Sequence, residues 1–173
     1  MPTLLLSALL MMAGAAEPAG AAAPADCAAS PAALPAELAG WATPAALTAA
    51  AGADASAATL TIGQAADLAL HPTPHVAYPV APARPGDAAS YGGVAQFSVA
   101  KAGIYRVALD TGAWVDIVTE GRSLESQAHG HGPACSGIHK MVDFQLEPGR
   151  YLLDIVGSAS PSARVLVAQL PAG

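Results

Sequence analysis

All five histidines of this 173-residue chain fall in two short segments, and they are the first candidates for chemistry. Imidazole nitrogens suit zinc, copper and iron as ligands. Two of them stand two residues apart on a glycine-rich stretch and could bring two nitrogens to one ion. We therefore expect a candidate metal site of His129, His131 and His139, joined by His71 and His75 if the two segments meet in the fold.

The histidine-rich segments have two other interpretations. In the first, the segment after residue 128 is a solvated loop whose glycines serve backbone turns and whose histidines have no function. In the second, this loop responds to pH, since histidine changes charge near about pH 6.5. No C-x-x-C or H-E-x-x-H spacing accompanies the histidines, so the pattern identifies no particular metal.

The chain has two cysteines, Cys27 and Cys135. In an oxidising compartment an isolated pair forms a disulfide more often than it stays as two free thiols. The expected bond ties the N-terminal arm to the histidine-rich loop and stabilises the fold by about 2–5 kcal/mol, mainly by restricting the unfolded chain. A disulfide-bonded Cys135 cannot serve as a metal ligand.

Charge narrows the choice of partners. Seven Lys and Arg against thirteen Asp and Glu leave a net charge of −6. No basic patch or basic–aromatic alternation is visible, so we expect no nucleic acid partner. The expected partner is a protein or a small ligand of unknown identity. No stretch of about 18 apolar residues occurs, so we expect no transmembrane span.

Other polar and aromatic side chains form no recognisable catalytic motif. Ser136 lies outside the context of a nucleophile elbow. Trp114 and Tyr105 are expected to be core aromatics, and Lys140 is expected to be a solubilising surface charge. Four aspartates are expected on solvated sheet faces or near turns rather than paired in a cleft: Asp110, Asp116, Asp143 and Asp154.

The N-terminus has the pattern of a targeting segment. An apolar run over residues 4–12 precedes small residues with A-x-A spacing, although no Lys or Arg stands before it. We expect residues 1–23 to be a signal peptide and the mature protein to be periplasmic or secreted. Residues 24–58 are rich in Ala and Pro. They are expected to form an arm anchored by residues such as Trp41, followed by a flexible link over 48–58.

From residue 59 onward short apolar runs alternate with turns, and no helical pattern lies between them. Turns are expected at residues 101–103 and at Glu120-Gly121. About nine short strands at this spacing predict an all-β fold, an antiparallel, jelly-roll-like β-sandwich over residues 59–173. The expected strands include residues 65–70, 76–80, 94–99, 104–110, 114–119, 142–146 and 151–155.

The strands over residues 142–146 and 151–155 have the pattern of a hairpin. Apolar residues alternate with polar ones in both, and Pro148-Gly149 stands between them. Pro148 suits the first central position of a type II turn, and Gly149 suits the second, which requires a positive φ. We therefore expect these two strands to pair with each other.

Residues 102–109, 114–118 and 144–153 together resemble the bacterial pre-peptidase C-terminal (PPC-like) domain family. The first run carries a G-x-Y strand, the second an acidic residue, and the third an L-x-P-G-x-Y pattern. The resemblance implies a jelly-roll-like sandwich of the kind appended to secreted proteases. This chain differs from the family in its His/Gly/Cys loop and shows no accompanying enzyme domain. The whole chain also resembles small exported proteins of alphaproteobacteria.

The spacing of His129 and His131, followed by Pro148-x-Arg150, also resembles the two motifs of cupin dioxygenases such as homogentisate dioxygenase. That resemblance implies an iron ion held by two histidines and a carboxylate. Here Cys135 stands where the pattern has Glu, and the downstream ligand histidine is missing. No visible motif therefore assembles the open site that binds oxygen in such enzymes.

Two functional hypotheses follow. The first is an exported, non-enzymatic binding or accessory module of the bacterial cell envelope. Its expected functional surface is the loop from His129 to Lys140, held by the disulfide. The alternative is a small histidine-loop metalloprotein or a cupin-like metal-dependent dioxygenase that uses zinc, copper or iron.

Overall fold

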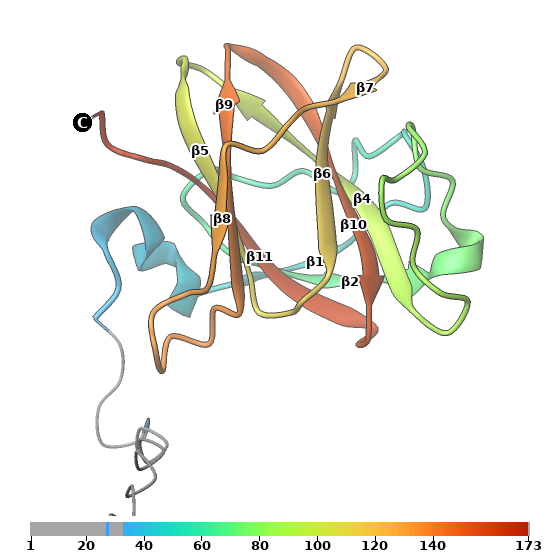
Figure 1. Ribbon diagram of the computed structural model, residues 1–173, viewed down its shortest axis with the longest axis horizontal. Helices are drawn as coiled ribbons and strands as arrows, with labels where there is room; N and C mark the ends of the chain where they lie inside the picture. Colours follow the sequence, from blue (N-terminus) through green and yellow to red (C-terminus); the bar gives the residue numbers. More distant parts are fainter. Residues whose placement is uncertain (1–26, 28–32, 173) are drawn as a thin grey trace, which may run out of the picture.

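The computed structural model describes residue 27 and residues 33–172, so the predicted signal peptide lies outside the described residues. Within them the chain forms eleven strands and two short 3-10 helices (Figure 1). The elements are η1 (Ala36–Ala42), β1 (Ala45–Thr48), β2 (Ala66–Ala69), β3 (His71–Pro72), η2 (Thr73–His75), β4 (Tyr91–Val99), β5 (Gly103–Leu109), β6 (Trp114–Thr119), β7 (Arg122–Ser123), β8 (Ala128–Gly130), β9 (Lys140–Leu146), β10 (Gly149–Ser158) and β11 (Ser162–Gln169).

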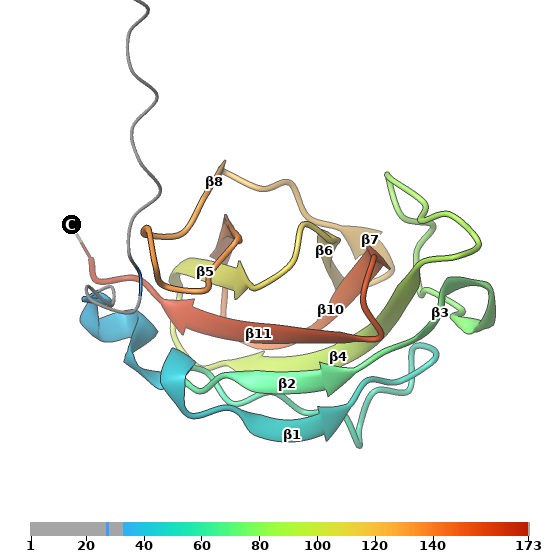
Figure 2. The ribbon, with the colours of Figure 1, turned by 90° about the horizontal axis from the view of Figure 1, so that it is seen from below.

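The strands form two sheets that face each other across the core (Figures 1 and 2). One sheet has the order β1-β2-β11-β5-β9-β8 and the other has the order β3-β4-β10-β6-β7. The pairing of β1 with β2 is parallel, and the other pairings between these strands are antiparallel. The predicted all-β sandwich is therefore confirmed.

Alternation of side chains along each strand decides which residues fill the space between the sheets. Val107 and Leu109 of β5 and Leu153 of β10 are completely buried there. Phe97 of β4 stacks on its register neighbour Tyr151 of β10, with ring centroids 5.6 Å apart. Burying such a side chain contributes about 1.5–3 kcal/mol, so these inward positions supply most of the stability of the sandwich.

Most consecutive strands belong to opposite sheets. The chain changes sheet between β4 and β5, between β5 and β6, between β9 and β10, and between β10 and β11. The predicted hairpin over residues 142–146 and 151–155 is therefore wrong, because β9 pairs with β5 and β8 while β10 pairs with β4 and β6. Gly149 has no positive φ and begins β10 opposite Val99.

The connection between β6 and β7 is a true hairpin. Glu120 and Gly121 have φ values of 50° and 73°, and Thr119 pairs with Arg122 on either side of them. Two successive positive φ values are typical of a type I′ turn, whose twist matches that of the flanking strands. The turn predicted at Glu120-Gly121 is confirmed, and it places residues 123–126 beside the end of β6.

The N-terminal arm packs on the outer face of the first sheet. Leu38 and Trp41 of η1 are buried against Ala108 of β5 and Leu166 of β11. The segment over residues 48–58, expected to be a flexible link, is instead packed onto the sandwich. Ala50 exchanges two backbone hydrogen bonds with Val94, of 2.7 and 2.9 Å. The small side chains of this segment allow the backbones to come close together. The sequence did not predict this packing because the segment has few large apolar residues.

The predicted strand over residues 76–80 is also not formed. This segment instead crosses the outer face of the second sheet, where the Tyr78 hydroxyl donates a 2.9 Å hydrogen bond to the Ile155 carbonyl. Among residues 33–172, no helix has the length and apolar character needed to cross a membrane.

Candidate functional site

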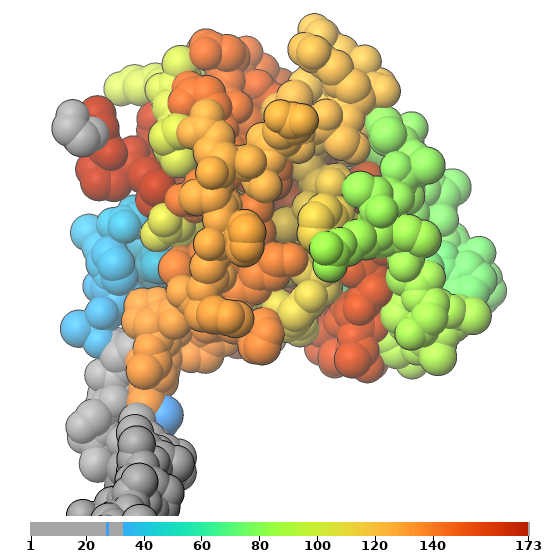
Figure 3. All heavy atoms as spheres, in the orientation of Figure 1, coloured from blue at the N-terminus to red at the C-terminus, as the bar shows by residue number. Residues whose placement is uncertain are grey.

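A cleft of about 950 Å³ opens at the side of the sandwich where the sheets end in β8 and β7. Figure 3 shows the recess between the residues of β8, in orange, and the loop before β4, in green. Val142 and Phe144 of β9 and Val115 of β6 form its apolar lining. The rims are residues 83–87 on one side and residues 123–126 on the other.

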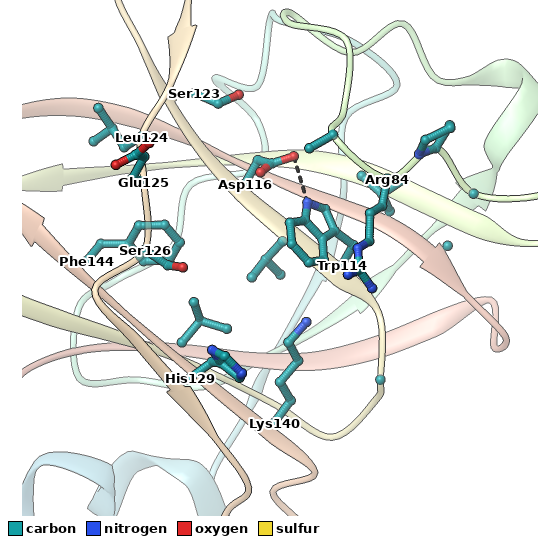
Figure 4. A pocket seen from close by; sticks show the side chains of 18 of the residues that line it. Arg84, Trp114, Asp116, Ser123, Leu124, Glu125, Ser126, His129, Lys140 and Phe144 are labelled. Carbon is teal, nitrogen blue, oxygen red and sulfur yellow. Dashed lines mark hydrogen bonds between the residues drawn. The ribbon is translucent and has the colours of Figure 1, made fainter.

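Trp114 is the most prominent side chain in this cleft (Figure 4). Its indole Nε1–H donates a 3.0 Å hydrogen bond to Oδ2 of Asp116. The two residues lie two positions apart on β6 and therefore share a face of the strand. Val115 and Ile117 occupy the core positions of β6, so Trp114 and Asp116 lie on its other face, and both line the cleft. The prediction that Trp114 is a core aromatic is wrong, whereas Tyr105 does lie in the core.

Two cationic side chains from different segments contact the Trp114 ring. The guanidinium carbon of Arg84 lies 4.8 Å from the ring centroid, and Nζ of Lys140 lies 5.1 Å from it. Such cation–π contacts are stabilising, most strongly for tryptophan. Nζ of Lys140 also donates a 3.1 Å hydrogen bond to the Ala113 carbonyl. Lys140 is therefore part of the cleft and not a purely solvated surface charge as predicted.

The positive charges of Arg84 and Lys140 are not neutralised by ion pairs within the described part of the chain. Three other arginines are paired there, each with one carboxylate: Arg106 with Asp143, Arg122 with Glu120, and Arg164 with Asp67. Burial lowers the pKa of Lys140, and the nearby charge of Arg84 lowers it further, while Asp116 opposes the shift. The cleft thus holds, next to one aromatic ring, two basic groups that form no ion pair among the described residues.

His129 lines the cleft beside Lys140. It pairs with Val142 in the register of β8 and β9, and residues directly opposite each other in antiparallel strands have their side chains on the same face. His129 is therefore the one predicted metal ligand that this cleft includes. The same cleft is lined by Ser123, the last residue of β7, and by Glu125 and Ser126, which follow it.

The structure separates most of the predicted metal ligands. The rings of His131 and His139 lie edge to face with centroids 5.9 Å apart, and Nδ1 of His131 is 3.1 Å from the His139 carbonyl oxygen. His71 lies in β3, and its Nε2 is 2.8 Å from the Ala49 carbonyl oxygen.

β3 and β8 are edge strands of different sheets and lie far apart in Figure 2. The segment that holds His71 and His75 therefore does not meet the loop after β8. Among residue 27 and residues 33–172, no group of three or more His, Cys, Asp or Glu side chains could hold a metal ion.

The predicted disulfide is confirmed. Cys27 and Cys135 are bonded, with their Cα atoms 5.0 Å apart. The loop around Cys135 is folded on itself, since Oγ of Ser136 donates to the Pro133 carbonyl at 2.6 Å and accepts from the Ile138 N–H at 3.0 Å. Cys135 is thus unable to ligate a metal in this oxidation state, and the loop between β8 and β9 is tied to the N-terminal arm.

A buried carboxyl group lies beside Asp116, on the neighbouring strand. Asp154 of β10 is completely buried and is the register neighbour of Asp116 on β6. Burial, and then the charge of Asp116, raise the pKa of Asp154 to about 7. Burial and the charge of Asp154 raise the pKa of Tyr78 to about 12. The prediction that Asp116, Asp143 and Asp154 are solvated is wrong, because all three are buried. Asp143 pairs with Arg106, and Asp116 accepts the indole hydrogen bond of Trp114. The segment containing Tyr78 crosses the face of the sheet that holds Asp154.

Sequence reasoning missed Arg84 and misjudged Trp114 and Lys140. No motif in the sequence links these three residues, which come from the loop before β4, from β6 and from β9. Only Lys140 fell within the loop that was expected to carry function. The aromatic–basic grouping exists because strands that lie far apart in sequence end at the same side of the sandwich.

The comparisons with known proteins identify no relative of this chain. No protein-family model matches the chain, and no curated protein matches it either. The resemblances to PPC-like domains, cupin dioxygenases and small exported proteins therefore stay predictions, and the function has to be argued from the cleft itself.

Proposed function

We propose that this protein is an exported, non-enzymatic binding module of the bacterial cell envelope, and that the cleft around Trp114 binds its ligand. The observation that carries the proposal is the geometry of Trp114. Its ring is oriented by Asp116 and lies 4.8 and 5.1 Å from two cationic groups that have no ion-pair partner among the described residues. A concave, largely apolar site with a few converging polar groups is typical of small-molecule binding.

The polar groups of the cleft favour binding over nucleophilic catalysis. Ser123 and Ser126 line the cleft together with His129, but no hydrogen bond joins either hydroxyl to the imidazole in the described structure. A serine nucleophile requires such a contact with a general base. Asp116 is engaged with the indole, which gives it an orienting role.

Export is supported by two independent features. The N-terminal segment has the pattern of a signal peptide, and the Cys27–Cys135 bond is of the kind that persists in oxidising compartments. A binding module of the periplasm or of the secreted fraction fits both.

Nuclear magnetic resonance on the ¹⁵N-labelled protein tests the binding proposal. The chain has two tryptophans, so the spectrum contains two indole N–H signals, and a Trp41→Phe variant assigns them. The probes are glucuronate, glucose, glucose 6-phosphate and leucine. We expect at least one of them to shift the Trp114 signal in a saturable way while the buried Trp41 signal stays in place. A Trp114 signal that responds to none of the four contradicts the proposal.

A further inference from the structure

The charged side chains divide the cleft into two ends. Arg84 and Lys140 lie next to the Trp114 ring, and Glu125 lies on the opposite side of the opening (Figure 4). The hydroxyl-bearing residues Ser123 and Ser126 flank Glu125 in sequence and line the same end. One end of the cleft therefore holds both lining cations, beside Asp116, and the other offers the exposed carboxylate of Glu125 and two hydroxyl groups.

The acidic lining residues differ in how far they are already engaged. Asp116 accepts the indole hydrogen bond at 3.0 Å, and Oδ1 of Asp87 accepts a 3.0 Å hydrogen bond from the Ala89 N–H. Glu125 is exposed and is free of such contacts within the described residues. It is the lining carboxylate best able to accept hydrogen bonds from a ligand.

The balance of charges selects among ligand classes. Two cations, Arg84 and Lys140, line the cleft together with three carboxylates: Asp87, Asp116 and Glu125. A dianion such as a phosphate ester meets stronger repulsion from these carboxylates than a monocarboxylate does. A neutral ligand forgoes the charge-assisted hydrogen bonds that Arg84 and Lys140 can make.

We propose that the ligand is a hydroxylated monocarboxylate, that is, a sugar acid or a saccharide unit that bears one carboxylate. This inference rests on the proposed binding function of the cleft and names its ligand class. The carboxylate binds Arg84 and Lys140, since guanidinium and ammonium groups form short, strong hydrogen bonds with carboxylates. The hydroxyl groups donate to Glu125, and the carbon skeleton lies against Phe144.

The shape and charge state of the cleft support this class. Its volume of about 950 Å³ is within the range of small-molecule sites. A bound carboxylate favours the charged form of Lys140, whose pKa is lowered mainly by burial in the free protein. The Trp114 ring offers apolar contact area beside the two cations, while its N–H is held by Asp116.

Isothermal titration calorimetry at low ionic strength tests the ligand class, with glucuronate as the probe and glucose as its neutral match. We expect glucuronate to bind at least about tenfold more tightly than glucose, and the affinity to fall as salt is added. Arg84→Ala and Lys140→Met are each expected to weaken glucuronate binding by about tenfold. Lys101→Ala, which removes a charge outside the cleft, is expected to change it by less than about twofold.

Glu125→Gln separates the hydroxyl contacts from the carboxylate contacts. It keeps an acceptor oxygen but removes the charge, so we expect a loss of about threefold for glucuronate. Melting temperatures within a few degrees of the wild type establish that each variant is folded. Arg84 lies on an exposed loop, so its variant gives a valid result even if Lys140→Met fails to fold.

Three outcomes overturn the ligand class. The first is equal affinity for glucose and glucuronate. The second is tighter binding of glucose 6-phosphate than of glucuronate. The third is tighter binding of leucine than of glucuronate, which would indicate an amino acid site. In each of these cases the Trp114 signal still responds to a probe, so the binding function stands. If the Trp114 signal responds to none of the four probes, the binding function and the ligand class fall together.

Discussion

The carboxyl groups of Asp154 and Asp116 are carried by directly opposed residues on the adjacent strands β10 and β6. Both oxygens of Asp154 are buried and have no hydrogen-bond partner among the described residues. An unpartnered buried carboxylate is strongly unfavourable, so the group is held in its protonated form until about pH 7. Asp116 lines the cleft and holds the Trp114 indole, so this pair connects the stability of the cleft wall to pH.

Replacing Asp154 by Asn is predicted to remove a pH dependence of stability. The folded carboxyl keeps its proton up to about pH 7, whereas the unfolded one loses it near 3.8. Between these values the folded state binds more protons, so the free energy of unfolding falls as the pH rises. The unfolding free energy lost in this way between about pH 4 and pH 7 is at most roughly 4 kcal/mol. Urea denaturation of both proteins at several pH values between 4 and 8 measures it.

The matched control for this experiment is Asp87→Asn, which alters an exposed carboxyl on the loop before β4. It is expected to leave the wild-type slope unchanged. If Asp154→Asn and the wild type show the same slope between pH 4 and pH 7, Asp154 is ionised in the folded protein and the account of this pair is wrong.

The disulfide is predicted to stabilise the whole sandwich. Because it joins Cys27 to Cys135 over a sequence separation of 108 residues, its loss enlarges the conformational freedom of the unfolded chain. We expect a double Cys27→Ser/Cys135→Ser variant to lose about 2–5 kcal/mol of unfolding free energy. Reductant is expected to destabilise the wild type by a similar amount and to leave the double variant unaffected. Equal stability of the oxidised and reduced wild type would contradict this.

The ion pair between Arg106 and Asp143 is predicted to contribute measurably to stability. Nε and an Nη of Arg106 donate to the two carboxylate oxygens at 2.7 and 2.8 Å, and both side chains are largely covered. Removing one partner of such a pair leaves the other uncompensated, so Arg106→Ala is expected to lose about 1–3 kcal/mol. Arg122→Ala breaks an exposed 3.8 Å pair and should change stability by less than about 1 kcal/mol. Similar losses of stability in Arg106→Ala and Arg122→Ala would contradict the predicted difference between the two ion pairs.

A metal-binding function for the histidine loop remains testable. The structure brings His131 close to His139 but shows no group of three suitable ligands among residues 33–172. We predict that zinc, copper and iron are substoichiometric in the purified mature protein by mass spectrometry. The melting temperature is expected to change by less than about one degree with a chelator. Stoichiometric metal that disappears in His129→Ala/His131→Ala would instead support the metalloprotein alternative.

The sequence predicts many of the strands because inward-facing positions are apolar and alternate with polar ones. Phe144 and Leu146, for example, alternate with Asp143, Gln145 and Glu147, and both are buried. The same alternation says nothing about the partner strand. An inward-facing residue looks the same whether the next strand pairs alongside it or crosses to the opposite sheet, and this is why the expected pairing of β9 with β10 is wrong.

The candidate site could be predicted only in part for a related reason. Lys140 stands at the end of the loop that was expected to carry function, and the disulfide of that loop is confirmed. Trp114 and Arg84 come together through the way in which the two sheets end. Asp154 occupies a position that alternation assigns to solvent, but a loop of small and proline-rich residues covers it. Such coverage by loops has no periodic signature in a sequence.

The most direct test of the account is the affinity of glucuronate for the wild type and for Trp114→Ala, measured by calorimetry under identical conditions. Trp41→Phe serves as the control for the loss of a tryptophan elsewhere. The account predicts saturable binding in the wild type, a similar affinity in Trp41→Phe, and a loss of at least about tenfold in a folded Trp114→Ala protein. Unchanged affinity in Trp114→Ala would place the ligand outside the cleft and contradict the central claim.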